Sequence, residues 1–328
     1  MVTFEAQLDA EISHFRSLTY ADSTKKSYSC HRRQYIQFCS EMGYRAVPVT
    51  QETLLRYTVF LARRLTVASV RKYLNVVRLL HLEHGFPNPL RENWFLDTLL
   101  KGVSREKGLS VKRKLPISPE ILLKIKSLLN FNLILDSMFW AACTTAFFGF
   151  FRKSNLFPPS ATKFDNTKHL CRSDFSLFHW GLLLNIRWSK TIQFKERTFQ
   201  APLPLLKYHP LCPVAAVVHA FALTPLANSE GPAFLKEGPR GLVPISPELF
   251  VKILRGLLTH LGLAAHEFSG HSFRRGSASW AIQQGIPGEI IKILGDWKSD
   301  AYLAYLSLDT KSKISSMSQF AENLPSST

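Results

Sequence analysis

The sequence predicts a mainly α-helical protein with a small antiparallel β-sheet, built as an N-terminal helical bundle followed by an α+β domain. The first hundred residues show amphipathic helical patterns separated by short turns, without the alternation typical of strands. Residues 173–205 change to strand-like alternation around turns at Gly181 and near residues 193–196. The chain has 328 residues, 46% of them hydrophobic, which exceeds the usual size of one compact core and predicts two domains.

The N-terminal domain is expected over residues 1–103. Asp22, with the serine after it, can cap one helix, and Thr50 starts another. A third amphipathic run ends at Gly85, and a fourth follows it. These patterns indicate a helical bundle.

An interdomain linker is expected over residues 104–116. The stretch mixes Gly, Ser, Lys, Arg and Pro without an apolar period, and we place the boundary near Arg113. Lys112, Arg113 and Lys114 can follow DNA phosphates or resemble a short nuclear-import cluster, but three basic residues are common by chance and a plain linker is the preferred explanation.

The second domain is expected over residues 117–328. It opens with an amphipathic helix (EILLKIKSLLN) and a nearly all-apolar one (DSMFWAACTTAFFGFF), which we expect to be buried on every side. The strand-like region follows, and then helical patterns resume with PVAAVVHAFAL, PELFVKILRGLLTHLGL, SFRRGSASWAIQQG and PGEIIKILGDW.

The charge balance favours a polyanionic partner. Lys and Arg number 41 against 24 Asp and Glu, a formal net charge of +17. Residues 1–114 hold 19 basic and 10 acidic residues and are the more densely positive part. Either phosphate contacts or a solvated surface explains this basic character. The residues that we expect to contact DNA are Lys25, Lys26, Arg32, Arg33, Arg71, Lys72, Lys112, Arg113, Lys114 and Arg275.

Several other classes of protein are disfavoured. The five cysteines are odd in number and scattered, without a CxxC pair, so neither a disulfide framework nor a zinc site is indicated. No segment has eighteen uncharged apolar residues in a row, and the first residues lack an apolar signal region. We expect no metal, no cofactor and no membrane partner.

Five separated motifs carry the candidate chemistry. His271 and Arg274 lie three residues apart at a predicted helix start, where both can reach one anion. Arg152 follows the buried helix in GFFRKSNL, and Lys190 lies in WSKTIQF at the end of a predicted strand. The segment GDWKSDAYLAYL supplies Trp297, and it also supplies Tyr305, which is thirty-one residues after Arg274.

In this order, and preceded by a basic helical bundle, the motifs resemble the tyrosine recombinase (phage integrase) family over nearly the whole chain. The segment HSFRRGSASWAIQQGIPGEIIKILGDWKSDAYLAYL is most similar to the recombinases of eukaryotic mobile elements, such as Crypton-type transposons and tyrosine-recombinase retrotransposons. The resemblance implies a core-binding N-terminal domain, a catalytic C-terminal domain, double-stranded DNA as substrate and a nuclear location.

The resemblance also implies a role for each residue. Tyr305 is the expected nucleophile, because a phenol forms a phosphotyrosine that stores the energy needed for rejoining. The expected partners are Arg152 and Arg274 as phosphate ligands, Lys190 as general acid for the 5′-oxygen, His271 on the phosphate or as acceptor of the tyrosine proton, and Trp297 as N–H donor to the phosphate.

Three assignments have alternatives. Lys195 competes with Lys190, and Asp296 competes with Trp297, although an aspartate would repel a phosphate. Tyr302 competes with Tyr305, but spacing favours Tyr305 and makes Tyr302 a packing residue.

One departure from the family pattern bears on activity. Asn155 stands three residues after the first arginine, where relatives often carry an acid. Its amide can accept a hydrogen bond but lacks the charge.

The polar tail is expected to carry one helical stripe formed by Ile314, Met317, Phe320 and Leu324. In the family such a segment commonly docks on a neighbouring protomer, so either that contact or an intramolecular one explains the stripe. We expect a homo-oligomer, a dimer or tetramer, on DNA.

Three functions compete at this point. The first is a strand-exchange enzyme that forms a metal- and ATP-independent 3′-phosphotyrosyl intermediate and comes from a mobile element. The second is a domesticated DNA-binding protein with the same fold and no recombination activity, supported by Asn155 alone. The third is a topoisomerase, whose family usually carries more elaborate linker regions.

Overall fold

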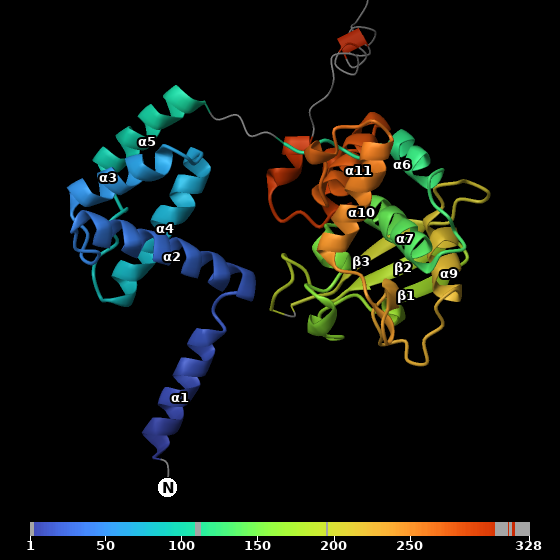
Figure 1. The fold of residues 1–328 in the computed structure, drawn as a ribbon, viewed down its shortest axis with the longest axis horizontal. Coiled ribbons are helices and arrows are strands. Elements are labelled where there is room, and N and C mark those ends of the chain that lie inside the picture. Colours follow the sequence, from blue (N-terminus) through green and yellow to red (C-terminus); the bar gives the residue numbers. More distant parts are fainter. Residues whose placement is uncertain (1–2, 109–112, 195, 306–313, 315–316, 319–328) are drawn as a thin grey trace, which may run out of the picture. The chain divides into compact units, whose positions relative to one another are not determined.

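The computed structural model describes residues 3–108, 113–194, 196–305, 314 and 317–318, apart from the side chains of residues 301, 304 and 305. The chain divides into two compact units, Met1–Lys112 and Arg113–Thr328 (Figure 1). Residues 104–107, which we expected in the linker, continue the last helix of the first unit, because the amphipathic pattern and last-turn basic residues extend that helix to Lys107. Within the described ranges, no helix is long and apolar enough to cross a bilayer.

The first unit is a helical bundle, as predicted. Thr50 accepts a hydrogen bond from the Thr53 amide (3.2 Å) and begins a helix there, whereas Asp22 is the first helical residue of its helix rather than the cap. Tyr35 and Tyr57 pack at the centre of the core, with ring centroids 5.0 Å apart. The helices are α1 (Phe4–Ser17), α2 (Asp22–Met42), α3 (Gln51–Ala62), α4 (Val67–Glu83) and α5 (Trp94–Lys107).

The second unit packs helices around a small antiparallel sheet. In that sheet β2 pairs with β1 on one side and with β3 on the other, with Leu184 opposite Phe175 and Ala201. A separate two-stranded ladder, β4 with β5, lies outside the region predicted to be β. The strands are β1 (Phe175–Phe178), β2 (Gly181–Ile186), β3 (Phe199–Pro204), β4 (Leu235–Gly238) and β5 (Gly241–Pro244).

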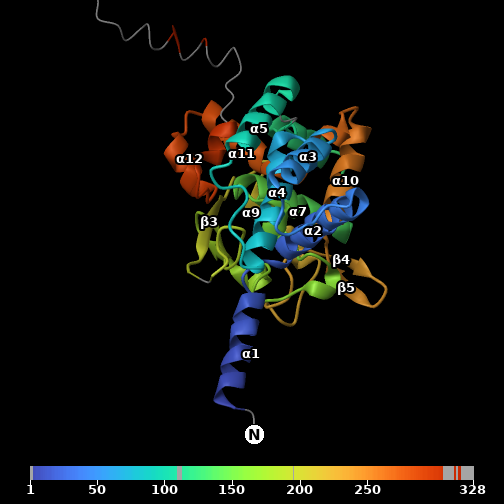
Figure 2. The same cartoon turned by 90° about the vertical axis from the view of Figure 1, so that its left-hand side faces the viewer.

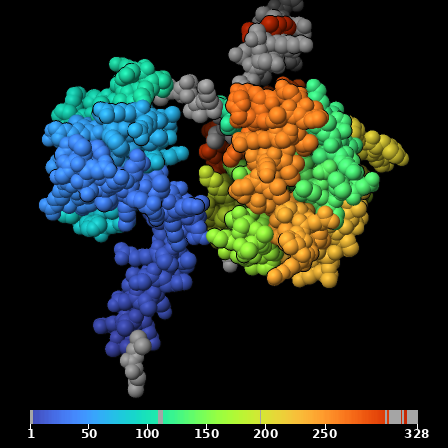
Figure 3. Space-filling view, in the orientation of Figure 1, coloured from blue at the N-terminus to red at the C-terminus, as the bar shows by residue number. Residues whose placement is uncertain are grey.

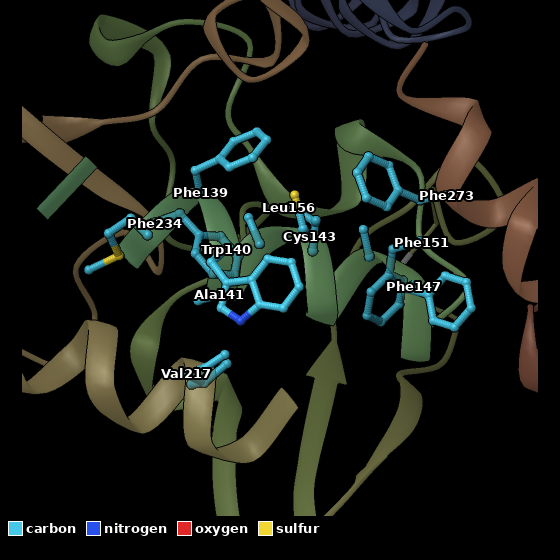
Figure 4. Packing of buried hydrophobic residues seen from close by; sticks show 14 of the residues in the cluster. Phe139, Trp140, Ala141, Cys143, Phe147, Phe151, Leu156, Val217, Phe234 and Phe273 are labelled. Carbon is cyan, nitrogen blue, oxygen red and sulfur yellow. The ribbon is translucent and has the colours of Figure 1, made fainter. Parts of the chain in front are cut away.

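Helix α7 (Ile134–Phe148) is the centre of the second core, as its apolar sequence predicts. Its residues Phe139, Trp140 and Cys143 are buried, and Phe234 and Phe273 from other elements join the same cluster (Figure 4). The remaining helices are α6 (Pro119–Lys126), α8 (Lys153–Leu156), α9 (Pro213–Ala222), α10 (Pro247–His260), α11 (His271–Gln283) and α12 (Gly288–Leu294), with 3₁₀ turns η1 (Ala161–Lys163), η2 (Arg172–Asp174), η3 (Ala265–Glu267) and η4 (Asp300–Tyr305).

The start of the second unit is fastened to α11. The Ile117 amide donates to the Ser272 carbonyl (2.9 Å), and the Arg275 Nη1 donates to the Lys114 carbonyl (2.6 Å). Gly276 allows this close approach, because a Cβ atom there would lie 1.8 Å from the Ile117 carbonyl oxygen. Residues 114–117 are therefore part of the second unit rather than free linker.

We predict that Gly276→Ala lowers the free energy of unfolding of the second unit by about 1–3 kcal/mol, because backbone must move to accept the methyl group. Gly256→Ala in α10 is the matched control, since nothing lies within 4 Å of its added Cβ. The control should be neutral or stabilising by about 0.5–1 kcal/mol. Urea unfolding followed by tryptophan fluorescence tests both, because five of the six tryptophans lie in the second unit. Equal stabilities for the two variants would contradict the prediction.

Candidate active site

Arg274 lies at the centre of the candidate site. It is one turn into α11 and only 3% exposed. Its Nη1 donates to the Phe150 carbonyl oxygen (2.6 Å), and its guanidinium carbon lies 3.6 Å from the centroid of the Trp297 ring. Phe150 has a φ of +53°, a conformation that costs energy for an aromatic residue. The arginine therefore joins α11 to the end of α7 and to the segment after α12.

Arg152 lies two residues after Phe150 and immediately precedes α8. Its backbone N–H donates to the Asn155 side-chain oxygen (3.0 Å), which fixes the start of α8. The amide thus makes a positioning hydrogen bond to the backbone of the first arginine, although it supplies no charge.

His271 is the first residue of α11, as the sequence predicts, and its amide donates to the Ser269 hydroxyl (3.2 Å). Partial burial lowers the pKa of His271, and the positive charges of Arg152, Arg274, Lys153 and Lys190 lower it further, in that order. The imidazole therefore has four cationic neighbours and is neutral at pH 7.

Lys190 lies in a tight turn four residues beyond the end of β2. Ser189 and Ile192 close this turn through two backbone hydrogen bonds of 3.1 and 3.2 Å, and the lysine side chain is exposed. The competing Lys195 lies outside the described residues.

Asp296 anchors the loop that carries Lys190. Its carboxylate accepts hydrogen bonds from the Thr191 hydroxyl and from the Arg197 guanidinium. The aspartate is therefore engaged by the loop, and Trp297 is the residue that contacts Arg274.

Trp297 and Tyr302 belong to a small apolar cluster that supports the site. The two rings have centroids 6.2 Å apart, and both side chains are buried. Tyr302 is buried, as expected for a packing residue rather than the nucleophile. Tyr305 is the last residue of η4, three residues further on, and its side chain lies outside what the structure describes.

Lys153 is a neighbour of the site that the motif analysis did not single out. Its side-chain carbons pack on Gly270, where an added Cβ would lie 2.8–2.9 Å from them. With Lys252, Arg255 and His271, it lines a cavity of about 590 Å³. In the sequence, the one indication that Lys153 lies near the site is that it directly follows Arg152.

The predicted DNA-contacting residues have mixed surroundings. Arg32 makes an ion pair with Glu83 (2.6 Å), and Lys114 donates from Nζ to the His266 carbonyl (2.7 Å). Arg275 holds the Lys114 carbonyl, as described above. Exposed side chains on the first unit are Lys25, Lys26, Arg33, Arg71 and Lys72; Arg113 is also exposed, and Lys112 lies outside the described residues. Their contacts with DNA remain predictions.

The arrangement is suited to binding a phosphate. Two guanidiniums and two ammonium groups lie around one neutral imidazole, and an indole packs on the Arg274 guanidinium. Such donors can stabilise a developing phosphorane. In the described part of the chain, no group of three or more His, Cys, Asp and Glu side chains is placed to hold a metal ion.

Comparison with known proteins agrees with the motifs. The sequence matches no protein-family model. It is 25% identical over 272 residues to an integrase/recombinase xerD homolog of Selenomonas ruminantium, a match that covers 81% of this chain and 75% of the relative.

Solved structures show the same fold. The Tn1549 transposon integrase, in complex with circular intermediate DNA, aligns with a TM-score of 0.57 at 12% identity over 95% of this chain and 98% of its own. A lambda integrase dimer bound to a core site aligns with a TM-score of 0.56 at 16% identity over 93% of this chain and 77% of its own. The chain therefore has the fold of these recombinases and integrases. The predicted fold class is therefore confirmed: the chain is mostly helical with small antiparallel sheets, and its structural neighbours are tyrosine recombinase catalytic domains.

We predict that His271 titrates below pH 6.5 and that Lys153→Gln raises its midpoint, because one repelling cation is removed. Lys207→Gln, at an exposed position, is the matched control and should leave the midpoint unchanged. Proton NMR of the imidazole, assigned with His271→Gln, measures all three midpoints. A wild-type midpoint at or above 6.5 would show that the four cations do not surround this ring.

Proposed function

We propose that the chain is a site-specific DNA recombinase that cleaves and rejoins strands through a 3′-phosphotyrosyl intermediate on Tyr305. The observation that carries the proposal is the gathering of Arg152, Lys190 and Arg274 around a neutral His271. The family relationship supports the same activity.

The proposed chemistry conserves the phosphodiester energy. The Tyr305 phenolic oxygen attacks the phosphorus, and its proton passes to His271, which can accept it because it is neutral. The bond from phosphorus to the 5′-oxygen breaks, and Lys190 protonates the leaving oxygen. Rejoining reverses these steps, so one phosphorus–oxygen bond replaces another and neither ATP nor a metal ion is required.

Charge builds on the phosphate oxygens in the transition state. Arg274 is already fixed by the Phe150 carbonyl and the Trp297 ring, so it needs little rearrangement to meet that charge. Arg152 starts from a backbone position fixed by Asn155. Asn155 therefore gives weak support to the alternative of an inactive, domesticated DNA-binding protein.

The first unit supplies DNA affinity in this proposal. Its exposed basic side chains on α2 and α4 can neutralise DNA phosphates, and such contacts release counterions. Several copies act together on DNA, as a dimer or tetramer. Lambda integrase, one of the similar structures, is a dimer on its core site.

We further infer that the chain comes from a mobile element and works in a nucleus. The sequence around Tyr305 resembles that of Crypton-type and retrotransposon recombinases, which supports this origin. The similarity to a transposon integrase supports the mobile element, and Lys112, Arg113 and Lys114 fit an import cluster.

We predict that Tyr305→Phe abolishes the covalent protein–DNA adduct on a nicked suicide substrate and leaves DNA affinity nearly unchanged, because only the nucleophilic oxygen is lost. Tyr302→Phe is the matched control and should still form the adduct, since Tyr302 is only 7% exposed and packs against Trp297. A denaturing gel measures the adduct formed by each variant. Incubation in EDTA before the gel tests whether adduct formation needs a metal ion.

Three outcomes would contradict this assignment. An adduct from Tyr305→Phe with none from Tyr302→Phe would move the nucleophile to Tyr302. Adducts from both variants would exclude tyrosine catalysis at η4. A wild-type chain that binds DNA and yields no adduct, with or without EDTA, would favour the domesticated binding protein.

A further inference from the structure

Asp296 is an acidic residue beside a candidate site that gathers four cationic side chains. It lies in the turn that ends α12, where its amide donates to the Ile293 carbonyl (3.0 Å). Its φ is +51°, a left-handed conformation that aspartate and asparagine adopt more readily than most residues. The side chain is only 16% exposed, and one oxygen accepts from the Thr191 hydroxyl while the other accepts from the Arg197 guanidinium. Both carboxylate oxygens therefore bind protein groups, and the guanidinium balances their charge.

The Thr191 hydroxyl extends this contact into the turn that carries Lys190. Because Thr191 donates its one hydroxyl proton to Asp296, it accepts from the Ser189 hydroxyl (2.9 Å). The Thr191 amide in turn donates to the Ser189 side-chain oxygen (3.1 Å). Lys190 lies between these two residues, and its carbonyl accepts from the Gln193 side chain (2.8 Å). A chain of hydrogen bonds therefore runs from Asp296 to both sequence neighbours of the lysine.

The loop between β2 and β3 needs such contacts because it reaches the surface of the second unit (Figure 3). Phe194, in this loop, is 86% exposed. Near the start of β3, Arg197 pairs with Asp296, and Glu196 pairs with Lys298 (3.3 Å). The pair of Glu196 and Lys298 is the more exposed of the two, and ion pairs at a surface contribute little. The contacts of Asp296 are therefore the stronger polar link between the loop and the segment after α12.

The same turn also places a side chain on Arg274. Helix α12 lies beside α11, which carries this arginine (Figure 2). Trp297 directly follows Asp296, its amide donates to the Lys292 carbonyl (3.0 Å), and its ring lies over the Arg274 guanidinium. Gly295 is required before them, because a Cβ atom there would lie 1.7 Å from the Trp297 ring. Two successive side chains of one turn therefore reach the lysine loop and the phosphate-binding arginine.

We propose that Asp296 is a positioning residue for the leaving-group proton, because its carboxylate holds the Lys190 turn where the ammonium group reaches the 5′-oxygen. The inference rests on the proposed cleavage of DNA by Tyr305 with Lys190 as general acid. The positive charge of Lys190 contributes to the lowered pKa of His271, which agrees with a turn held beside the site. Asp296 touches no reacting atom in this assignment, so its removal acts on the reaction through Lys190.

A DNA substrate with sulfur in place of the scissile 5′-oxygen separates this role from a merely structural one. The Tyr305 oxygen again attacks the phosphorus, but the bond that breaks is the phosphorus–sulfur bond and the leaving group is a 5′-thiolate. A thiol is a far stronger acid than an alcohol, so the thiolate leaves without receiving a proton. Loss of the general acid therefore slows cleavage of the oxygen substrate and spares cleavage of the sulfur substrate.

The test measures the single-turnover rate of adduct formation by the full chain on suicide substrates of both kinds. Asp296→Asn keeps the shape of the side chain and tolerates the same φ, but it carries no charge. We expect it to slow the oxygen substrate about tenfold or more and the sulfur substrate by less than about twofold. Lys190→Ala should give the same pattern with a larger loss on the oxygen substrate, of about a hundredfold or more. Thr191→Val removes only the hydroxyl on the loop and should give a weaker form of the pattern.

Asp300→Asn is the matched control. It breaks the ion pair of Asp300 with Lys292 (2.7 Å), which lies in the same region but does not involve the loop, so any slowing should be equal on the two substrates. The proposal is overturned if Asp296→Asn leaves both rates unchanged or slows both equally, or if Lys190→Ala slows both equally. A wild-type chain that binds both substrates and cleaves neither would overturn the proposed function itself, and this inference with it.

Discussion

The buried guanidinium of Arg274 is the interaction on which the rest of the site depends. A charge at 3% exposure is costly unless the protein holds it in a defined environment, and here a backbone carbonyl and an indole ring provide part of that environment. The carbonyl belongs to Phe150, whose positive φ turns the chain between the end of α7 and Arg152. The indole belongs to Trp297, whose cluster with Tyr302 leads into η4. One side chain thus sets the relative positions of three sequence-distant segments.

Two further contacts complete this frame. Asp296 binds Thr191 and Arg197, which ties the Lys190 loop to the residue just before Trp297. Gly276, two residues after Arg274, lets the start of the second unit lie against α11, the helix that carries His271 and Arg274. In the proposed mechanism, Arg274 and the Lys190 loop are therefore held in place before DNA binds, which is the condition for electrostatic stabilisation of a transition state.

The sequence predicted most of this frame because its signals are local or strongly patterned. Apolar periodicity located the bundle helices and the buried α7, and the order of motifs led to the fold that the solved structures share. What it missed depends on contacts between distant residues: the pairing of β4 with β5, the approach of Lys153 to Gly270, and the role of Asp296, which spacing alone could not separate from Trp297. Asn155 looked like a defect, yet its amide still supports Arg152.

Mapping the covalent bond tests the central claim most directly. The wild-type adduct trapped on a suicide substrate is digested with protease and nuclease, and the nucleotide-bearing peptide is sequenced by mass spectrometry. The account predicts a single modified residue, Tyr305, joined to the 3′-phosphate of the cleaved strand. A phosphate on Tyr302 or on a serine, or a bond to a 5′-phosphate, would contradict it.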